Sequence, residues 1–232
     1  MHDTEDVLRK QRQRPTTASR RAPRRPRYPG PFWKIPKLWV DERCYILGGG
    51  PSLNDVDVSR LRGQHVIAVN NAFNLGNWIE FMFYGHCGFG SWHGRALSRF
   101  PGYKLTTCVY QTKLLFKPKV MKYSQKFGLS SDPKRVCWNR SSGACAVNVA
   151  TLLGATEIVL FGFDMQRIDG QNNWHNEHPI TDANMADPYE SFLEPWLEIA
   201  RDARKLSIEI INATPGSELR LFSIVEPEEI LP

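Results

Sequence analysis

The sequence predicts one α/β domain, an open and mostly parallel sheet with helices on both faces. Three observations favour this fold. Short segments recur that are continuously apolar, as is typical of strands buried on both faces of a sheet. Helical patterns separate these segments, and a glycine-rich turn follows the first of them. This order of strands and helices is Rossmann-like, and ligands of such folds bind at the carboxyl ends of the strands.

Six segments are predicted to be strands: 43–47, 65–70, 80–84, 103–109, 157–162 and 208–212. Residues 143–154 are small and apolar on almost every side and end in glycine, which predicts a helix buried against the sheet. Residues 189–205 carry apolar side chains at helical spacing with charges between them. That pattern predicts an amphipathic surface helix.

Charge divides the chain into a tail, residues 1–30, and a domain, residues 31–232. The tail holds nine Lys or Arg against three acids, whereas the rest of the chain holds 21 of each sign. Because the tail is rich in arginine and proline and poor in apolar side chains, we expect it to be disordered. Its charge fits contact with DNA or RNA phosphates or an acidic partner, and fits a solubilising tether equally well.

The compartment is predicted from cysteines and hydropathy. Five cysteines, an odd number without a Cys-x-x-Cys pair, argue against a disulfide framework and for a reducing cytoplasm. No run of 18 apolar residues occurs, so no membrane span is expected. The N-terminus lacks the apolar stretch of a secretory signal. We therefore expect a cytoplasmic protein.

The glycine-rich turn is the most informative motif. It consists of Gly48, Gly49, Gly50, Pro51 and Ser52. Glycines allow positive φ and close approach to a ligand, and unpaired N–H groups at such a turn bind phosphate. The serine is expected to cap the helix that follows. The motif points to nucleotide or nucleotide-sugar binding, although strand–glycine–helix turns also serve packing alone.

Two further polar clusters lie where the predicted fold places a ligand. Asn70 and Asn71 follow the second strand, and an asparagine amide reads a base edge or a sugar hydroxyl, or sets a turn. The start of the buried helix carries Arg140, Ser141, Ser142 and Gly143. There hydroxyls, N–H groups, the helix dipole and a guanidinium can meet one anion. A plain serine N-cap accounts for one of the two hydroxyls.

A candidate donor-binding residue and two candidate bases follow the fifth strand. Asp164 lies just beyond it, and the long polar loop that comes next carries His175 and His178. Either histidine can act as a general base near neutral pH. Their spacing, without a clear third ligand, gives poor support for a metal, and none is predicted there.

Several familiar motifs are absent from the sequence. It has no Walker lysine, Gly-x-Gly-x-x-Gly, nucleophile elbow or Cys-x-x-Cys knuckle, which excludes the commonest NTPase, dehydrogenase, hydrolase and zinc-finger interpretations. His86, Cys87 and His93 form a loose cluster among glycines. For that cluster a structural role is favoured.

The four polar clusters, in this order, resemble a superfamily that joins bacterial CMP-sialic-acid sialyltransferases with 6-hydroxymethylpterin pyrophosphokinase-like proteins. Phage-encoded relatives, some labelled norphogenetic proteins, are included. The resemblance runs from about Cys44 to Phe222. It rests on Gly-Gly-Gly-Pro-Ser-Leu at 48–53, Val-Asn-Asn-Ala-Phe at 69–73, Ser-Ser-Gly at 141–143, Gly-Ala-Thr-Glu-Ile-Val-Leu-Phe-Gly-Phe-Asp at 154–164 and Asn-Ala-Thr-Pro-Gly-Ser at 212–217.

The resemblance implies a nucleotide-activated donor bound across the glycine-rich turn and the start of the buried helix. It assigns donor contacts to Gly49, Gly50, Pro51, Ser52, Asn70 or Asn71, Ser142 and Gly143, and the base to His175 or His178. The chain departs from the sialyltransferases in two places. They carry an asparagine inside the glycine loop, where this chain has Gly49, and tyrosines where Met165, Gln166 and Arg167 follow here. Sialic acid specificity is therefore not implied.

Three functions are compatible with these residues. The favoured one is a transferase that uses a nucleotide-activated donor, namely a sialyltransferase-like glycosyltransferase. It would have a histidine base, an unknown acceptor and no required cofactor. Arg140 and the helix start at Ser142 would stabilise the departing phosphate. A pyrophosphokinase-like enzyme would need ATP and Mg²⁺, with Asp164 as a ligand. The third is a non-catalytic phage module that holds nucleic acid through its tail. The expected location is the cytoplasm of a bacterium or of a phage-infected cell.

Overall fold

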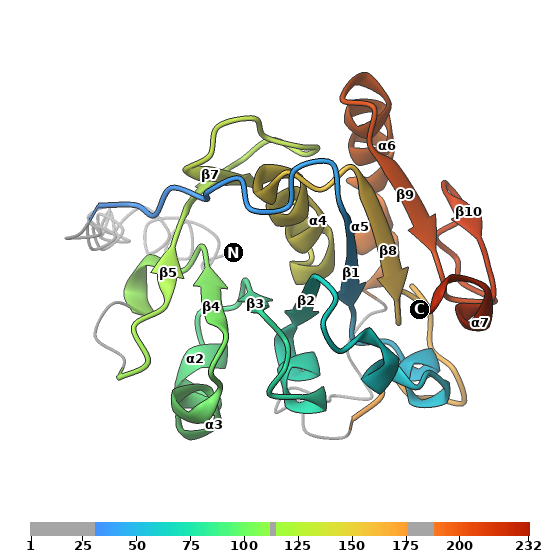
Figure 1. Cartoon of the computed structure of the whole chain (residues 1–232), viewed down its shortest axis with the longest axis horizontal. Helices are drawn as coiled ribbons and strands as arrows, with labels where there is room; N and C mark the ends of the chain where they lie inside the picture. The colour runs from blue at the N-terminus through green and yellow to red at the C-terminus, as the bar shows by residue number, and fades with distance from the viewer. Residues whose placement is uncertain (1–30, 112–114, 176–187) are drawn as a thin grey trace, which may run out of the picture.

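The computed structural model describes residues 31–111, 115–175 and 188–232, so the predicted tail and His178 lie outside the described residues. Its main sheet has eight strands in the order β10-β9-β8-β1-β2-β3-β4-β5, and these strands pair in parallel (Figure 1). Strands β6 and β7 form a separate parallel pair. The predicted α/β class with an open, parallel sheet is confirmed.

The strands are β1 (Arg43–Leu47), β2 (Val66–Val69), β3 (Phe81–Tyr84), β4 (Tyr103–Thr106), β5 (Lys119–Val120), β6 (Lys122–Ser124), β7 (Arg135–Cys137), β8 (Glu157–Phe161), β9 (Glu209–Asn212) and β10 (Ser223–Ile224). The α-helices are α2 (Phe89–Trp92), α3 (Gly94–Arg99), α4 (Ser142–Leu153), α5 (Tyr189–Leu193), α6 (Trp196–Lys205) and α7 (Pro227–Ile230). Shorter 3₁₀ helices cover Pro51–Asp55, Val58–Leu61, Asn70–Leu75 and Val109–Gln111. In the described part of the chain, no helix has the length and apolarity needed to cross a membrane.

Strand β1 shows why the predicted strands are continuously apolar. Cys44 and Ile46 pack into one core together with α4 and α6. Tyr45 and Leu47 point the other way, into a second core with α3 and the 3₁₀ helices. All four side chains are at most 2% exposed. Because helices cover both faces of the sheet here, these side chains of β1 are apolar on both faces.

Helix α4 forms and is buried as the sequence predicts. The Ser141 hydroxyl caps it by accepting a hydrogen bond from the Ala144 N–H at 3.2 Å. The helix ends at Gly154, whose φ of 106° is the left-handed conformation that glycine adopts without strain. A buried polar residue inside it, Asn148, accepts hydrogen bonds from the N–H groups of Ser130 and Cys137. These bonds join α4 to the segment around β7.

The helix predicted over residues 189–205 is two helices, α5 and α6. Pro195 lies between them, where its missing N–H and its ring are incompatible with a continuous helix. Helix α6 is amphipathic as predicted, with Trp196 and Ile199 fully buried. Leu197, expected on the apolar face, is 55% exposed.

The strand order places the ligand site. Strand β1 lies between β2 and β8, so the chain runs outward through β2 to β5 and returns through α4 to β8 on the other side. At such a reversal the loops at the carboxyl ends of neighbouring strands leave in different directions and open a crevice. The ends of β1 and β8 are therefore where a ligand is expected.

His65, just before β2, makes stability depend on pH. Its ring nitrogens lie 2.7 Å from Glu42 Oε2 and 2.9 Å from Glu80 Oε2. Burial lowers the pKa of His65, but these hydrogen bonds to carboxylates outweigh burial, and the pKa is raised. A histidine whose pKa is higher in the folded than in the unfolded state stabilises the folded protein fully at pH values below its unfolded-state pKa of about 6.5. This stabilisation is lost as pH rises through the folded-state pKa.

We predict that the free energy of unfolding falls as pH rises above about 6.5 and that His65→Gln flattens this slope. Urea unfolding at a series of pH values measures it. An unchanged slope in the variant would contradict the prediction.

Candidate functional site

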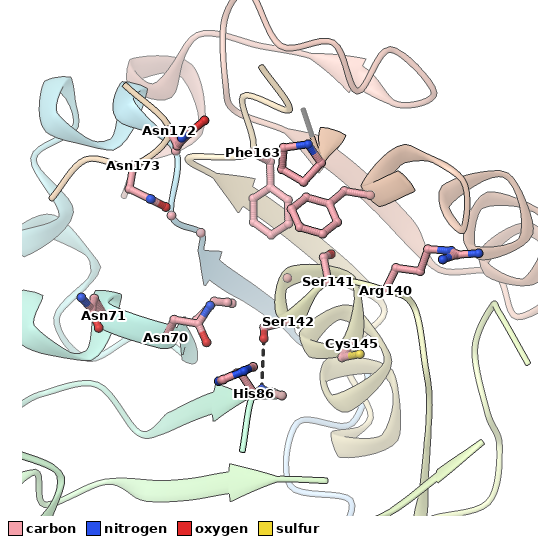
Figure 2. Close-up of a pocket in the computed structure, with 18 of the residues that line it drawn as sticks. Asn70, Asn71, His86, Arg140, Ser141, Ser142, Cys145, Phe163, Asn172 and Asn173 are labelled. Carbon is pink, nitrogen blue, oxygen red and sulfur yellow. Dashed lines mark hydrogen bonds between the residues drawn. The ribbon is translucent and has the colours of Figure 1, made fainter. Parts of the chain in front are cut away.

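A cavity of about 1160 Å³ opens at the carboxyl ends of β1, β2, β3 and β8 and at the start of α4 (Figure 2). This volume suits a nucleotide that carries a sugar. The sequence-predicted site residues that line it are Gly48, Gly49, Gly50, Asn70, Asn71, Arg140, Ser141, Ser142, Gly143, Asp164 and His175. Pro51 and Ser52 are not part of the lining. The structure thus brings three separate polar clusters and one histidine to the same cavity.

The glycine-rich turn packs closely on the end of β8. The Gly48 N–H donates to Phe161 O at 2.7 Å, and the Gly50 N–H donates to Gly162 O at 2.8 Å. A Cβ atom at Gly50 would lie 1.7 Å from Asp164 Oδ2. Positive φ occurs at Gly162 and not in the turn, so that expectation was wrong. The turn needs glycine because protein atoms crowd it, and of its three glycine N–H groups only that of Gly49 is unpaired with a described residue.

Ser52 binds Asp164 instead of capping a helix. Its hydroxyl donates to Asp164 Oδ2 at 2.9 Å, and its N–H donates to Oδ1 at 3.2 Å. The 3₁₀ helix after the turn begins at Pro51, and its N-cap residue is Gly50, without a side-chain cap, which corrects the expectation. Asp164 is 2% exposed, and burial raises the pKa of its carboxyl although the hydrogen bonds from Ser52 oppose the rise. The carboxylate therefore fastens the turn to the end of β8.

The start of α4 presents hydrogen bond donors to the cavity. Ser142 Oγ accepts from the Gly85 N–H at 3.0 Å, which joins α4 to the end of β3 (Figure 2). Within the described residues, the N–H groups of Ser142 and Gly143 donate no hydrogen bond. N–H groups in the first turn of a helix have no partner inside it, and together with the helix dipole they favour an anion.

Arg140 is turned away from this helix start. Its Nε lies 2.6 Å from Glu194 Oε2, and its guanidinium lies over the rings of Phe127 and Trp138. In Figure 2 the side chain projects away from Ser142. In this arrangement Arg140 is held at the rim of the cavity by an ion pair. The sequence suggested contact with a donor phosphate, whereas here the Nε–H is directed to Glu194.

His175 is the described member of the two candidate bases. Its Nδ1 lies 3.2 Å from Asn71 Nδ2. The loop that carries it is joined to the glycine-rich turn, because the neighbouring Trp174 N–H donates to Gly49 O at 3.0 Å. Asn71 is 3% exposed, and within the described residues its Oδ1 has no hydrogen bond partner. Asn71 therefore contacts the base candidate and not open solvent.

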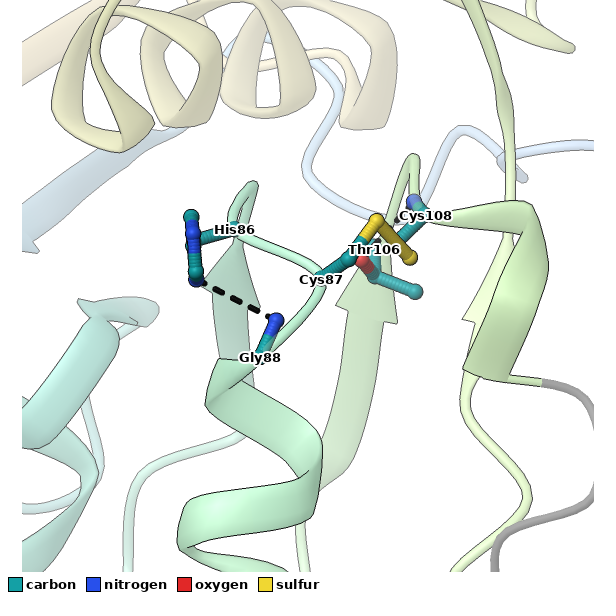
Figure 3. Close-up of a disulfide and its surroundings, with 5 residues drawn as sticks. All are labelled: His86, Cys87, Gly88, Thr106 and Cys108. Carbon is teal, nitrogen blue, oxygen red and sulfur yellow. Dashed lines mark hydrogen bonds between the residues drawn. A yellow bond between two sulfur atoms is a disulfide. The ribbon is translucent and has the colours of Figure 1, made fainter.

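Two residues of the loose cluster also line the cavity, which sequence reasoning missed. His86 and Cys87 follow β3, and Cys87 forms a disulfide with Cys108, which follows β4 (Figure 3). The expectation against disulfides is wrong for this pair, because the two strands are neighbours and bring the Cα atoms to 5.3 Å. The available signal was a cysteine just after one predicted strand, 80–84, and another near the end of the next, 103–109. His93, by contrast, packs on Phe89 and has a structural role.

One wall of the cavity is aromatic. It includes Tyr110, Tyr123, Trp138, Tyr189 and Phe192. The first three are 51%, 40% and 49% exposed. Aromatic faces of this kind stack on bases and on sugar rings. These aromatic residues were not predicted as site residues because they lie outside the predicted strands or at their edges.

The acidic side chains of the cavity offer little to a metal ion. In the described ranges, no three His, Cys, Asp or Glu side chains are grouped as ligands. Asp164 is the one acid among the described lining residues, and both of its carboxylate oxygens accept from Ser52. Hard cations such as Mg²⁺ are usually held by one or two accessible carboxylates together with substrate phosphates.

The fold is similar to that of solved sialyltransferases. The sialyltransferase CstII from Campylobacter jejuni, in complex with the substrate analogue cytidine-5′-monophosphate, is 15% identical with a TM-score of 0.50, over 85% of this chain and 87% of that chain. The sialyltransferase CST-II in complex with a trisaccharide acceptor and CMP is 15% identical with a TM-score of 0.47, over 79% and 86%. CstII from Campylobacter jejuni in complex with CMP-3FNeuAc is 16% identical with a TM-score of 0.47, over 79% and 85%.

At 15% identity, the first of these structures establishes a shared fold. No protein-family model and no curated protein sequence matches this chain. The class that fold and cavity define together is an α/β protein with a cavity at the reversal of strand order, where ligands of such folds bind.

We predict that Gly50→Ala lowers the free energy of unfolding by about 1–3 kcal/mol, because its Cβ would overlap Asp164 and force the turn off β8. Gly49→Ala is the matched control, since its Cβ would meet only Asn173 Oδ1 at 3.3 Å. Urea unfolding measures both. Equal effects at the two positions would show that the close approach to Asp164 is not what requires glycine.

Proposed function

We propose that this chain is a transferase that uses a nucleotide-activated donor, namely a glycosyltransferase of the sialyltransferase-like type. One observation carries the proposal: a single cavity joins the His175 side chain with N–H groups that have no partner among the described residues, that of Gly49 in the turn and those at the start of α4. The N–H groups suit the phosphate of a donor. The histidine suits an acceptor hydroxyl that must lose its proton.

The transfer step follows from this placement. The acceptor oxygen forms a bond to the anomeric carbon of the donor sugar while the bond from that carbon to the phosphate oxygen breaks. The acceptor proton passes to His175, and the nucleotide leaves with the electron pair of the broken bond. N–H groups aimed at the phosphate stabilise the charge that develops there.

Asn71 sets which nitrogen of His175 receives that proton. A base needs a lone pair toward the acceptor, and Nε2 carries the ring's lone pair when Nδ1 carries the ring hydrogen. If the Asn71 amide is turned by about 180°, its Oδ1 accepts a hydrogen bond from the Nδ1–H of His175. This oxygen has no other partner among the described residues. We propose this orientation for the working enzyme.

The shared fold makes CMP the first nucleotide to test, because the CstII structure was solved with cytidine-5′-monophosphate. The Mg²⁺-dependent, pyrophosphokinase-like reaction and nucleic-acid contact through residues 1–30 stay predictions from the sequence. Asp164, the expected Mg²⁺ ligand, is committed to Ser52. We therefore propose transfer without a resident metal or cofactor.

A nucleotide screen tests the donor. CMP, UDP, GDP and ATP are titrated with and without Mg²⁺ by isothermal calorimetry, and we predict binding of CMP without Mg²⁺. Binding of ATP alone, and only with Mg²⁺, would replace this proposal with the pyrophosphokinase-like one. Absence of any nucleotide binding would remove both.

We predict that His175→Ala lowers kcat/KM about 10²- to 10⁴-fold while nucleotide affinity stays nearly constant, because a general base acts on the acceptor. Transfer from a nucleotide sugar of the selected nucleotide is measured at saturating acceptor. His65→Gln, which lies at the opposite ends of the strands, is the histidine control. An unchanged rate in His175→Ala would assign the base to another residue.

A further inference from the structure

We infer that His86 is a catalytic residue that donates a hydrogen bond from Nε2 to the phosphate of the bound nucleotide. The inference rests on the proposed function and adds to it a residue that neither the motifs nor the resemblance pointed to. It is carried by the way the structure fixes this ring in the cavity.

The loop that carries His86 is held on both sides. The preceding Gly85 donates its N–H to Ser142 Oγ at 3.0 Å, so the loop starts against the first turn of α4. The following Cys87 is bonded to Cys108 and thereby joined to the end of β4 (Figure 3). The His86 ring stacks on Trp92, with centroids 5.0 Å apart and planes 22° apart. A side chain held in this way loses little conformational entropy when it binds a ligand.

A backbone hydrogen bond sets the tautomer of His86. The Gly88 N–H donates to His86 Nδ1 at 3.1 Å (Figure 3). Because a backbone N–H can only donate, Nδ1 must accept, and the neutral ring carries its hydrogen on Nε2. Within the described residues, Nε2 has no hydrogen bond partner, although the ring is exposed and lines the cavity. His86 is thus prepared as a donor, whereas His175 is proposed as an acceptor.

Phosphate is the ligand group that fits this donor. Gly85 places His86 beside Ser142, where the unpaired N–H groups of α4 begin. Some other donors are engaged elsewhere: Arg140 Nε pairs with Glu194, and the N–H groups of Gly48 and Gly50 bind the end of β8. A nucleotide phosphate is the part of a donor that accumulates charge during transfer. His86 and the first turn of α4 together supply the donors that charge requires.

The test compares CMP with cytidine, which lacks the phosphate. Affinities are measured by isothermal calorimetry for the wild-type chain, His86→Ala, His86→Gln and the control His65→Gln. We expect His86→Ala to weaken CMP binding about tenfold or more and to leave cytidine binding nearly unchanged. His86→Gln retains a side-chain N–H and should recover part of the loss. Imidazole ¹⁵N NMR of the wild-type chain should show His86 protonated on Nε2.

The outcomes separate this inference from the proposed function. If the wild-type chain binds CMP and His86→Ala binds it equally well, only the role of His86 is overturned. Equal losses for CMP and cytidine would assign His86 to the nucleoside or to folding and would also overturn it. A hydrogen on Nδ1 in the NMR spectrum would contradict the geometry directly. A wild-type chain that binds no nucleotide would remove the proposed function and this inference with it.

Discussion

The contact between residues 48–50 and 162–164 is the constraint on which the site depends. Two neighbouring strands end there, and the turn after β1 lies on the turn after β8 through hydrogen bonds from the Gly48 and Gly50 N–H groups. Only glycine fits at this distance, since a Cβ at Gly48 would lie 2.5 Å from Gly162 O. Burying the Asp164 carboxylate is tolerable because Ser52 supplies two hydrogen bonds to it.

The remaining parts of the cavity are positioned by contacts that begin at this turn. Gly49 O accepts from the Trp174 N–H and so holds the loop that carries His175, which in turn meets Asn71 after β2. On the other side, Ser142 holds the loop after β3 through Gly85. Each candidate side chain is thus held by a residue that follows a different strand. A site assembled in this way depends on the sheet and not on any single loop.

The sequence predicts the parts of this structure that depend on local pattern. Continuous apolarity identifies β1 to β4, β8 and β9, and the glycine stop identifies the end of α4 at Gly154. Strands β5 and β10 escape prediction because each has two residues and is fixed by pairing with a neighbour. The break at Pro195 is a local signal that the apolar spacing of 189–205 concealed.

The site residues divide in the same way. Polar residues at strand ends were predicted to gather, and those of the described chain, apart from Ser52, line one cavity. The direction of each side chain was not predictable, because it is set by distant partners. Ser52 turns to Asp164, 112 residues away, and Arg140 turns to Glu194. A structural role was predicted for His86 because glycines surround it in the sequence. Its place in the cavity follows from the contact of Gly85 with α4.

The arrangement of the cysteines allows one wall of the cavity to be labelled selectively with a thiol reagent. Cys44, Cys137 and Cys145 are buried, and burial raises the pKa of each thiol, which keeps them unreactive. Cys87 is exposed and adjoins the cavity, although it is bonded to Cys108. A thiol-directed fluorophore applied after mild reduction would therefore attach at Cys87, next to His86. Its emission would report occupancy of the cavity without any knowledge of the acceptor.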